Sequence, residues 1–260
     1  MSKETKNNFI IHGGILAIAG ILVRIIGMFY RIPLMNIIGS EGNGVYSVAF
    51  NIYNIMLVLS SYGLPMAVSK LISARFAKRQ YRNAGQIFRS SVIISLCTGG
   101  AAALILFFGA GLIENVYKSV TGLAIPLRVL APTILFVAVM GVVRGFFQGQ
   151  GTMIPTAVSQ LIEQIVNAVV SILAGYLLMK AFAASPHVSA YGAAGGTLGT
   201  AAGALVGLIF LTVIYVIYRP VFGKMMKKDS ASEVISSGEI YKTILLTMAP
   251  IIIGQTLYNV

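Results

Sequence analysis

The sequence predicts an all-α, polytopic membrane helix bundle, and three observations carry this prediction. Of the 260 residues, 57% are hydrophobic and only 10% are charged, whereas soluble domains carry about a quarter charged residues. Apolar stretches of the length that crosses a bilayer, about 20 residues, recur along the chain. The lysines and arginines between them sort to one predicted side of the membrane. This pattern excludes a water-soluble enzyme or an ordinary globular module.

Six apolar stretches are predicted to cross the membrane as helices. They cover residues 9–30, 42–69, 90–113, 129–143, 154–179 and 191–218. The fourth is short, but Arg128 and Arg144 bracket it about 24 Å apart along a helix, which suits two side chains that reach opposite interfaces. Pro65 is predicted to kink the second span, because it removes a helix hydrogen bond.

A seventh apolar segment begins near Thr243 and is still running at Val260. We therefore expect a six-helix transmembrane lobe over residues 1–220, a basic cytoplasmic linker over 221–242 and the start of a seventh helix over 243–260. On this reading the chain is a truncated part of a larger transporter, and its C-terminal lobe is missing.

The positive charge is predicted to set the orientation rather than to bind nucleic acid. Of the 19 lysines and arginines, four fall on one predicted side, Arg24 lies inside a span, and the rest fall on the other side. Because basic loops stay in the cytoplasm, we expect a cytoplasmic N-terminus in a multi-pass protein of the bacterial inner membrane. The cytoplasmic set is Lys3, Lys6, Lys70, Arg75, Lys78, Arg79, Arg82, Arg89, Arg144, Arg219, Lys224, Lys227, Lys228 and Lys242, against Arg31, Lys118, Arg128 and Lys180.

Glycines recur every fourth residue in two of the predicted spans. The sixth span carries Gly195, Gly199, Gly203 and Gly207, and the fourth span continues into Gly141, Gly145 and Gly149. Such stripes let membrane helices approach closely. We favour packing within the bundle over a dimer interface.

Arg24 is the most informative single residue, because a charge near the middle of a span costs about 2.5–3.5 kcal/mol on insertion scales. On a helical wheel Gly13, Gly20, Gly27 and Arg31 lie within about 60° of it. One interpretation is a structural arginine that reaches the interface or a neighbouring carbonyl. The other is a fixed cation in a wet cavity, where its planar fork suits phosphate. We favour the second, since the neighbouring face lacks bulky side chains.

The fifth span carries a polar stripe on one helical face, centred on Glu163. A carboxylate near the membrane midplane is a functional candidate by default. The alternatives are that Glu163 neutralises Arg24 or stays protonated as a packing hydrogen bond. Ser47, Asn51 and Asn54 form a weaker stripe in the second span. The fifth-span stripe is Thr156, Gln160, Glu163, Gln164, Asn167 and Ser171.

Signatures of enzymatic chemistry are missing from the sequence. It contains no phosphate-binding loop, no zinc-protease motif and no cysteine–histidine ligand spacing, and Cys97 is its single cysteine. We therefore expect no catalytic residues, no metal and no cofactor.

Several segments resemble the polysaccharide-flippase branch of the multidrug/oligosaccharidyl-lipid/polysaccharide (MOP) exporter superfamily. They are RIIGMFYR at 24–31, GSEGNGVYSVAF at 39–50, YGLP at 62–65 and RGFFQGQGTMIPTAVSQLIEQ at 144–164. The resemblance is strongest to the stage V sporulation protein B (YtgP) type and more distant to the MurJ lipid II flippases. It implies a MATE-like transporter of two lobes, of which this chain is the first lobe plus the start of the second.

The resemblance also implies a function without covalent chemistry. Members of this branch move undecaprenyl-pyrophosphate-linked oligosaccharides, precursors of polysaccharide or peptidoglycan, across the bacterial inner membrane by alternating access. MurJ-type proteins use a cluster of cavity arginines, and Arg24 matches the first of them. The expected partners are this lipid-linked substrate, membrane lipids and the C-terminal lobe. The candidate cavity residues are Arg24, Arg31, Asn51, Asn54, Gln160, Glu163, Gln164 and Asn167.

Two other functions remain open from the sequence. A cation-coupled multidrug exporter of the same superfamily needs an acidic cavity, so Glu163 favours it and Arg24 counts against it. A membrane enzyme that acts on the same lipid carriers needs acid and base residues on its outer loops. Those loops hold only Glu41, Glu114 and His187, which argues against an enzyme.

Overall fold

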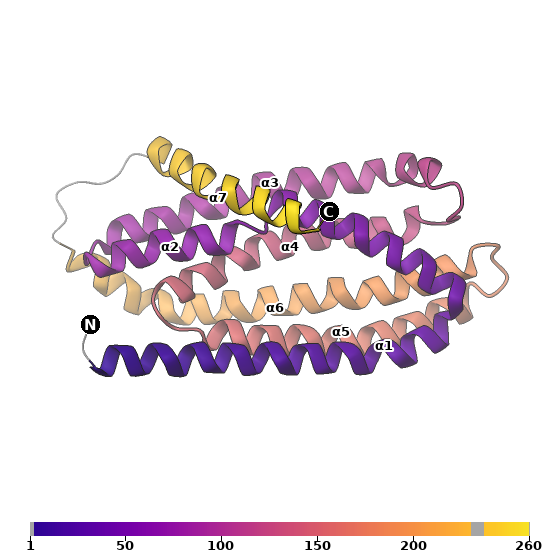
Figure 1. Ribbon diagram of the computed structural model, residues 1–260, viewed down its shortest axis with the longest axis horizontal. Coiled ribbons are helices and arrows are strands. Elements are labelled where there is room, and N and C mark those ends of the chain that lie inside the picture. The colour runs from indigo at the N-terminus through magenta and orange to yellow at the C-terminus, as the bar shows by residue number, and fades with distance from the viewer. Residues whose placement is uncertain (1–2, 230–236, 260) are drawn as a thin grey trace.

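Helices account for all the regular secondary structure in residues 3–229 and 237–259, which the computed structural model describes. The helices lie roughly side by side along one long axis (Figure 1). In chain order they are α1 (Lys3–Ser60), α2 (Leu64–Ala77), α3 (Tyr81–Val116), α4 (Ala124–Gly149), α5 (Ile154–Ala181), α6 (Val188–Lys227) and α7 (Ser237–Asn259).

Helix α1 reverses direction at Gly39, so it contains both the first predicted span and most of the second. The backbone of Gly39 has φ 70° and ψ −178°, a region that residues with a Cβ almost never occupy. In Figure 1 the first part of α1 runs along the bottom of the bundle and the second part folds back across it. A single glycine therefore converts one continuous helical sequence into two crossings.

The second predicted span is broken where we expected a kink. Helix α1 ends at Ser60 and α2 begins at Leu64, so Pro65 lies in the first turn of α2. A proline is well tolerated there, because the first helical N–H groups have no partner within the helix. The four later spans form α3 to α6, each longer than expected.

Five helical segments among the described residues are long and apolar enough to cross a membrane, and the first of them, Gly13–Ala77, merges the first two predicted spans. Helix α7 forms over the expected seventh segment but is not among these five. Helix α6 continues to Lys227, into the expected linker. The division into residues 1–220, 221–242 and 243–260 stays a prediction.

Two apolar clusters form the core, one toward each end of the bundle. The first cluster joins α1, α3, α4 and α6 around Leu34, Tyr46 and Leu127. The second joins α2, α3, α4, α6 and α7 around Ile72 and Phe146, and among the described residues it includes none from α1 or α5. At that end, α4 and α5 therefore do not share an apolar core.

Both glycine stripes pack against helices of the same bundle, as expected. A Cβ at Gly203 would lie 2.5 Å from the carbonyl oxygen of Glu163 on α5, and one at Gly145 would lie 2.6 Å from that of Pro65 on α2. Real Cβ atoms do not approach backbone so closely. The packing of α6 against α5 and of α4 against α2 therefore requires glycine at these positions.

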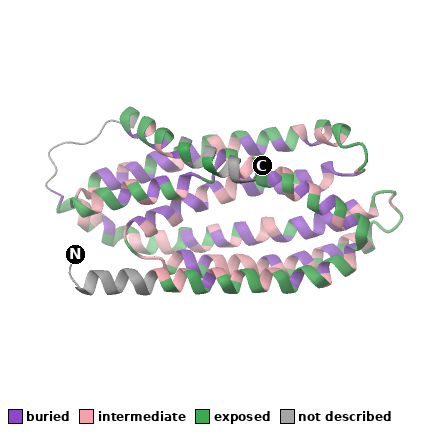
Figure 2. Cartoon of the chain, viewed as in Figure 1, coloured by how far each residue is buried: buried purple, intermediate pink, exposed green. Residues whose placement is uncertain are grey.

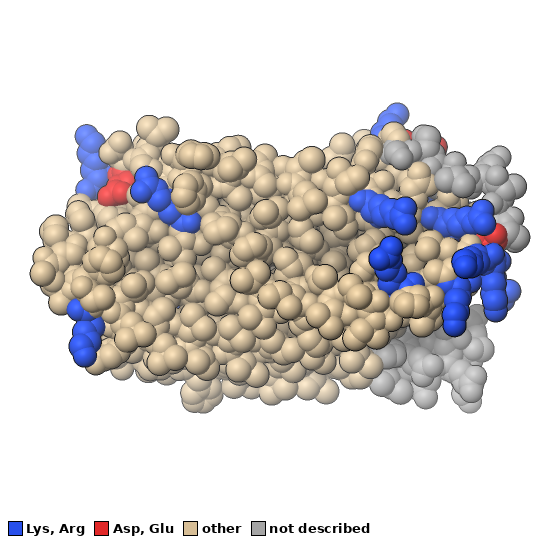
Figure 3. Space-filling model, turned by 180° about the vertical axis from the view of Figure 1, so that it is seen from behind, with Lys and Arg blue, Asp and Glu red and all other residues tan. Residues whose placement is uncertain are grey.

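The surface of the bundle is apolar along its length and charged at its ends. Lysines and arginines gather at one end, which we call the basic end, and few lie at the other (Figure 3). Exposed residues run along the helices (Figure 2), and among them are large side chains such as Phe108 and Ile105, which are 75% and 65% exposed. Such a belt is stable only in lipid, so the chain is a multi-pass membrane protein.

Candidate functional site

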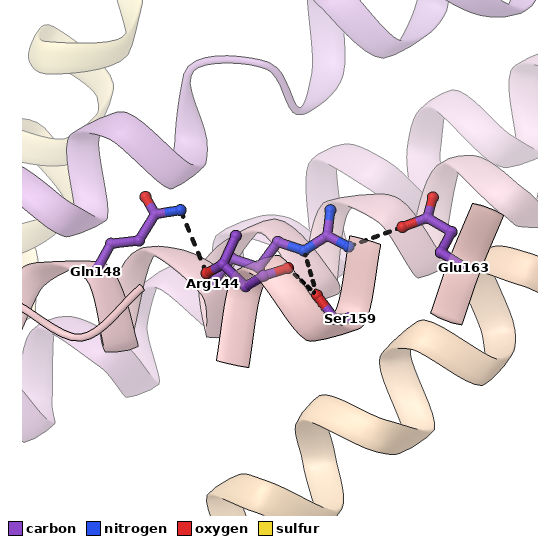
Figure 4. Close-up of polar contacts among 5 residues, drawn as sticks. Arg144, Gln148, Ser159 and Glu163 are labelled. Carbon is purple, nitrogen blue, oxygen red and sulfur yellow. Dashed lines mark hydrogen bonds and ion pairs between the residues drawn. The ribbon is translucent and has the colours of Figure 1, made fainter. Parts of the chain in front are cut away.

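An ion pair between α4 and α5 dominates the polar interior. The Nη2 of Arg144 lies 2.7 Å from Oε2 of Glu163, and the two side chains are only 15% and 27% exposed. The Nε of Arg144 donates a second hydrogen bond, of 3.1 Å, to the hydroxyl of Ser159. Figure 4 shows the third guanidinium nitrogen pointing away from both partners.

One turn nearer the basic end, Gln148 extends this contact. Its Nε2 donates to the hydroxyl of Thr156 at 3.3 Å, and Ser159 in turn donates to the carbonyl of Thr156 at 2.8 Å. We call Arg144, Gln148, Thr156, Ser159 and Glu163 the polar ladder (Figure 4). It joins α4 to α5 at the end where the apolar core does not reach α5.

The polar ladder corrects two expectations. Glu163 is neutralised by Arg144 and not by Arg24, and Arg144 is a half-buried partner rather than a charge of the cytoplasmic flank. Its interior position follows from the length of α4, which continues to Gly149. Arg144 is therefore more than a full helical turn inside the helix end.

Arg24 lies at the right depth to meet Glu163 but on the wrong side of α1. A Cβ at Gly27 would contact Gln164, and Tyr30 accepts a hydrogen bond from Asn167, 137 positions later. In both contacts the residue on α5 comes 137 positions after its partner on α1. The same separation places Arg24 level with position 161, within one turn of Glu163. The side chain of Arg24 is nevertheless exposed, and no ion pair or hydrogen bond joins it to another described residue.

Asn167 is placed in the helix packing. It is 8% exposed, its Nδ2 donates to Tyr30 on α1 at 3.3 Å, and its Oδ1 accepts from Ser171 at 2.9 Å. Ser171 also donates to the carbonyl of Gly196 on α6 at 2.8 Å. The inner half of the fifth-span stripe thus links α1, α5 and α6, while Gln160 and Gln164 are half-buried.

The other candidates form exposed polar positions on α1. Arg24, Arg31, Asn51 and Asn54 are all exposed, and the guanidinium of Arg31 lies 5.9 Å from the ring centre of Tyr46. Exposed arginines and amides in a membrane-spanning helix are costly unless they face water or other protein. We expect these positions to line a wet cavity.

Two of the three glycines beside Arg24 leave open space. A Cβ at Gly13 or at Gly20 would meet nothing within 4 Å. Gly27 differs, because a Cβ there would lie 3.2 Å from the Nε2 of Gln164, so the space beside Arg24 is open only toward Gly13 and Gly20.

Arg144 is not among the candidate cavity residues predicted from the sequence, although the sequence contains a signal for its position. Helices α4 and α5 are joined by only four residues, so they form an antiparallel hairpin. Counting outward from that turn places Gln148 opposite Thr156 and Arg144 opposite Ser159. The described residues contain no group of three or more His, Cys, Asp and Glu side chains that could hold a metal ion.

Comparison with known proteins gives the family. Residues 12–254 match the family described as "Polysaccharide biosynthesis protein". The chain belongs to this family. The match covers nearly the whole bundle, including most of α1 and the polar ladder.

Two curated relatives come from Bacillus subtilis (strain 168). The lipid II flippase MurJ is 32% identical over 222 residues, which is 82% of this chain and 39% of that protein. Stage V sporulation protein B is 32% identical over 221 residues, covering 83% and 40%. The chain thus spans about two fifths of the length of these relatives. Together with the family match, they place it in the polysaccharide-flippase branch of the MOP superfamily, whose members are transporters and not enzymes.

Solved structures show the same fold. A MATE transporter in the straight conformation matches with a TM-score of 0.75 at 19% identity, covering 97% of this chain and 53% of the other. A MOP superfamily transporter from Pyrococcus furiosus matches with a TM-score of 0.69 at 18% identity, with the same coverage. Because the match takes up about half of each transporter, the bundle corresponds to one lobe of a MATE-like fold.

Proposed function

We propose that this chain is the N-terminal lobe of a flippase for lipid-linked oligosaccharides, with undecaprenyl-pyrophosphate-linked sugars as the substrate. The observation that carries the proposal is the exposed, unpaired Arg24 on a membrane-spanning helix. The names of the two B. subtilis relatives support it. A second lobe would supply the opposite wall of the cavity.

The chemistry of the exposed positions suits a pyrophosphate that carries a sugar. A guanidinium presents two parallel N–H donors to a phosphate, so Arg24 and Arg31 would bind the pyrophosphate. Asn51 and Asn54 both donate and accept, which suits sugar hydroxyls and water. Arg144 is already neutralised by Glu163, so its charge is not the one available to the substrate.

The proposed setting is the bacterial inner membrane, with the N-terminus and the basic end in the cytoplasm. Charge sorting supports this orientation (Figure 3). The membrane potential then contributes about 2.3 kcal/mol per charge per 100 mV, enough to bias an alternating-access cycle in which charged groups move.

The alternative, a cation-coupled multidrug exporter, depends on a free carboxylate in the cavity. In this lobe the midspan carboxylate, Glu163, is held at 2.7 Å by Arg144. A paired carboxylate binds a coupling cation poorly, so the structure favours the flippase.

The test is complementation of a flippase-deficient strain by the full-length protein. Arg24→Gln is expected to lower flipping of the lipid-linked precursor at least tenfold, because it removes a charge-assisted hydrogen bond to the pyrophosphate. Arg128→Gln, which removes another exposed arginine of the bundle, is the matched control and should complement normally. Full activity of Arg24→Gln, or equal loss in both variants, contradicts the role of Arg24.

A further inference from the structure

A pocket of about 510 Å³ opens at the basic end between α3, α6 and α7. It lies away from Arg24 and from the polar ladder, and the proposed transport cycle does not use it. Its lining includes Arg82, Arg89, Ser90 and Ile93 of α3, Met226 of α6 and Tyr241 of α7.

Two arginines give the pocket its charge. Arg82 and Arg89 are seven residues apart, so they lie on one face of α3, two turns apart. The Nε of Arg82 donates to the carbonyl of Met226 at 3.2 Å, which holds this side chain across the gap to α6. The backbone N–H of Arg82 donates to the carboxylate of Asp229 at 2.7 Å, and Asp229 itself does not line the pocket.

Arg89 supplies the available cation. It is exposed, and it has no ion pair or hydrogen bond with another described residue. All five of its N–H donors can therefore reach a ligand. The lining beside it also includes the half-buried Gln86 and two small buried residues, Gly85 and Ser90.

The pocket changes from charged to apolar along α3. Ile93 lies one turn beyond Arg89, toward the middle of the bundle, and it is 50% exposed. The guanidinium groups thus lie nearer the helix end and the apolar side chain lies deeper in the membrane. A ligand that fits both parts has an anionic head and a hydrocarbon tail.

We propose that this pocket binds the phosphate headgroup of an anionic phospholipid from the adjacent leaflet. Basic pockets between membrane helices recognise such headgroups, and guanidinium groups form short charge-assisted bonds with phosphate oxygens. The first acyl carbons pack against Ile93. Because Met226 and Tyr241 also line the pocket, the bound lipid joins α3 and α6 to α7.

Lipid binding by the purified chain tests the site without any transport assay. Native mass spectrometry would compare phosphatidylglycerol with zwitterionic phosphatidylethanolamine in the same detergent. We expect one phosphatidylglycerol to bind about tenfold more tightly, a difference of about 1.4 kcal/mol. Equal retention of the two lipids overturns the proposal.

Variants of Arg89 test whether the preference for phosphatidylglycerol over phosphatidylethanolamine comes from the pocket. Arg89→Gln should abolish it, and Arg89→Lys, which keeps the charge without the planar fork, should retain part of it. Lys78→Gln removes another exposed cation at the basic end and should change nothing. Loss of the preference in the Lys78 variant points to diffuse surface charge and contradicts the pocket. If Arg89→Gln does not fold, an unchanged preference in Arg89→Lys would contradict recognition by the guanidinium fork.

Two competition experiments distinguish the sources of the phosphate. Inorganic phosphate that displaces phosphatidylglycerol at equal concentration shows a free-anion site and overturns the lipid proposal. If undecaprenyl pyrophosphate displaces the bound phosphatidylglycerol more strongly than added phosphatidylglycerol does, the pocket is a site for the transported lipid. That result also overturns the proposal. Neither result bears on Arg24, so this site and the proposed function can fail independently.

Discussion

Helix α1 and the seam formed by α4, α5 and α6 use the same residue types in opposite ways. In the seam, Arg144 is neutralised by Glu163, and glycines such as Gly203 lie against the backbone of α5. On α1, Arg24 is exposed and Gly20 faces open space. An arginine or a glycine in a membrane helix is therefore structural where another helix covers it and available for function where none does.

The largest expected effect on stability comes from breaking the ion pair between Arg144 and Glu163. Arg144→Ala leaves Glu163 half-buried without its partner, and we expect a loss of about 3 kcal/mol in the free energy of unfolding, near the lower end for uncompensated buried charges. Arg24→Ala is expected to cost under about 0.5 kcal/mol, as for surface positions. Denaturant titration in detergent measures both.

A double variant separates charge from packing in the same experiment. Arg144→Met with Glu163→Gln removes both charges and should recover most of the lost stability, because no unpaired ion remains. If Arg24→Ala proves as costly as Arg144→Ala, the distinction between covered and uncovered arginines fails.

The second effect compares glycines of the two regions. A Cβ at Gly199 would lie 2.6 Å from the carbonyl oxygen of Asn167, so Gly199→Ala should cost about 2 kcal/mol by overpacking the contact between α5 and α6. Gly20→Ala meets no atom and should be neutral or stabilising by up to about 1 kcal/mol, since alanine favours the helix. Thermal unfolding of the two variants measures the contrast, and equal destabilisation would contradict it.

A third effect concerns the one glycine on α1 that the backbone itself requires. Gly39→Ala forces a Cβ into a positive-φ conformation, and we expect a loss of about 1.5 kcal/mol. Gly44→Ala, five residues later with open space around it, is the control. Unfolding curves that shift equally for both variants would show that the reversal does not depend on glycine at position 39.

The smallest effect compares two carboxylates at the end opposite the basic end. Glu114 accepts the backbone N–H groups of Gly122 at 2.6 Å and Ala124 at 3.1 Å, which caps the start of α4. Glu41 on α1 accepts only the hydroxyl of Ser189, at 2.8 Å. We expect Glu114→Gln to cost about 1 kcal/mol, as for a lost helix cap, and Glu41→Gln to cost less. Thermal unfolding in detergent compares them, and a larger loss for Glu41→Gln would contradict this ranking.

Much of the fold was predictable because its signals are local. Apolar stretches, basic flanks and glycine spacing are properties of single segments. The helices, the charged ends and the close approach of the glycine-bearing helices to a neighbour in the bundle follow from them. The break before Pro65 was harder to predict. A proline marks a weak point in a helix, but neighbouring helices decide whether the chain kinks or starts a new helix.

The candidate site was predictable only in part. Helical spacing placed Thr156 and Glu163 on one face of α5, and both join the polar ladder, but it left out Ser159. It did not indicate which helix face meets which, so the alternative that Glu163 neutralises Arg24 named the wrong arginine, and the packing role of Asn167 was missed.

Hydropathy and loop charge do not depend on contacts, so the membrane environment, the helical class and the uneven distribution of positive charge follow from the sequence alone. That Arg144 neutralises Glu163 while Arg24 stays exposed depends instead on how the helices pack. The physical reason is that an ion pair is set by distances between helices. Two arginines at similar depth in the lobe differ only in whether their side chains face another helix.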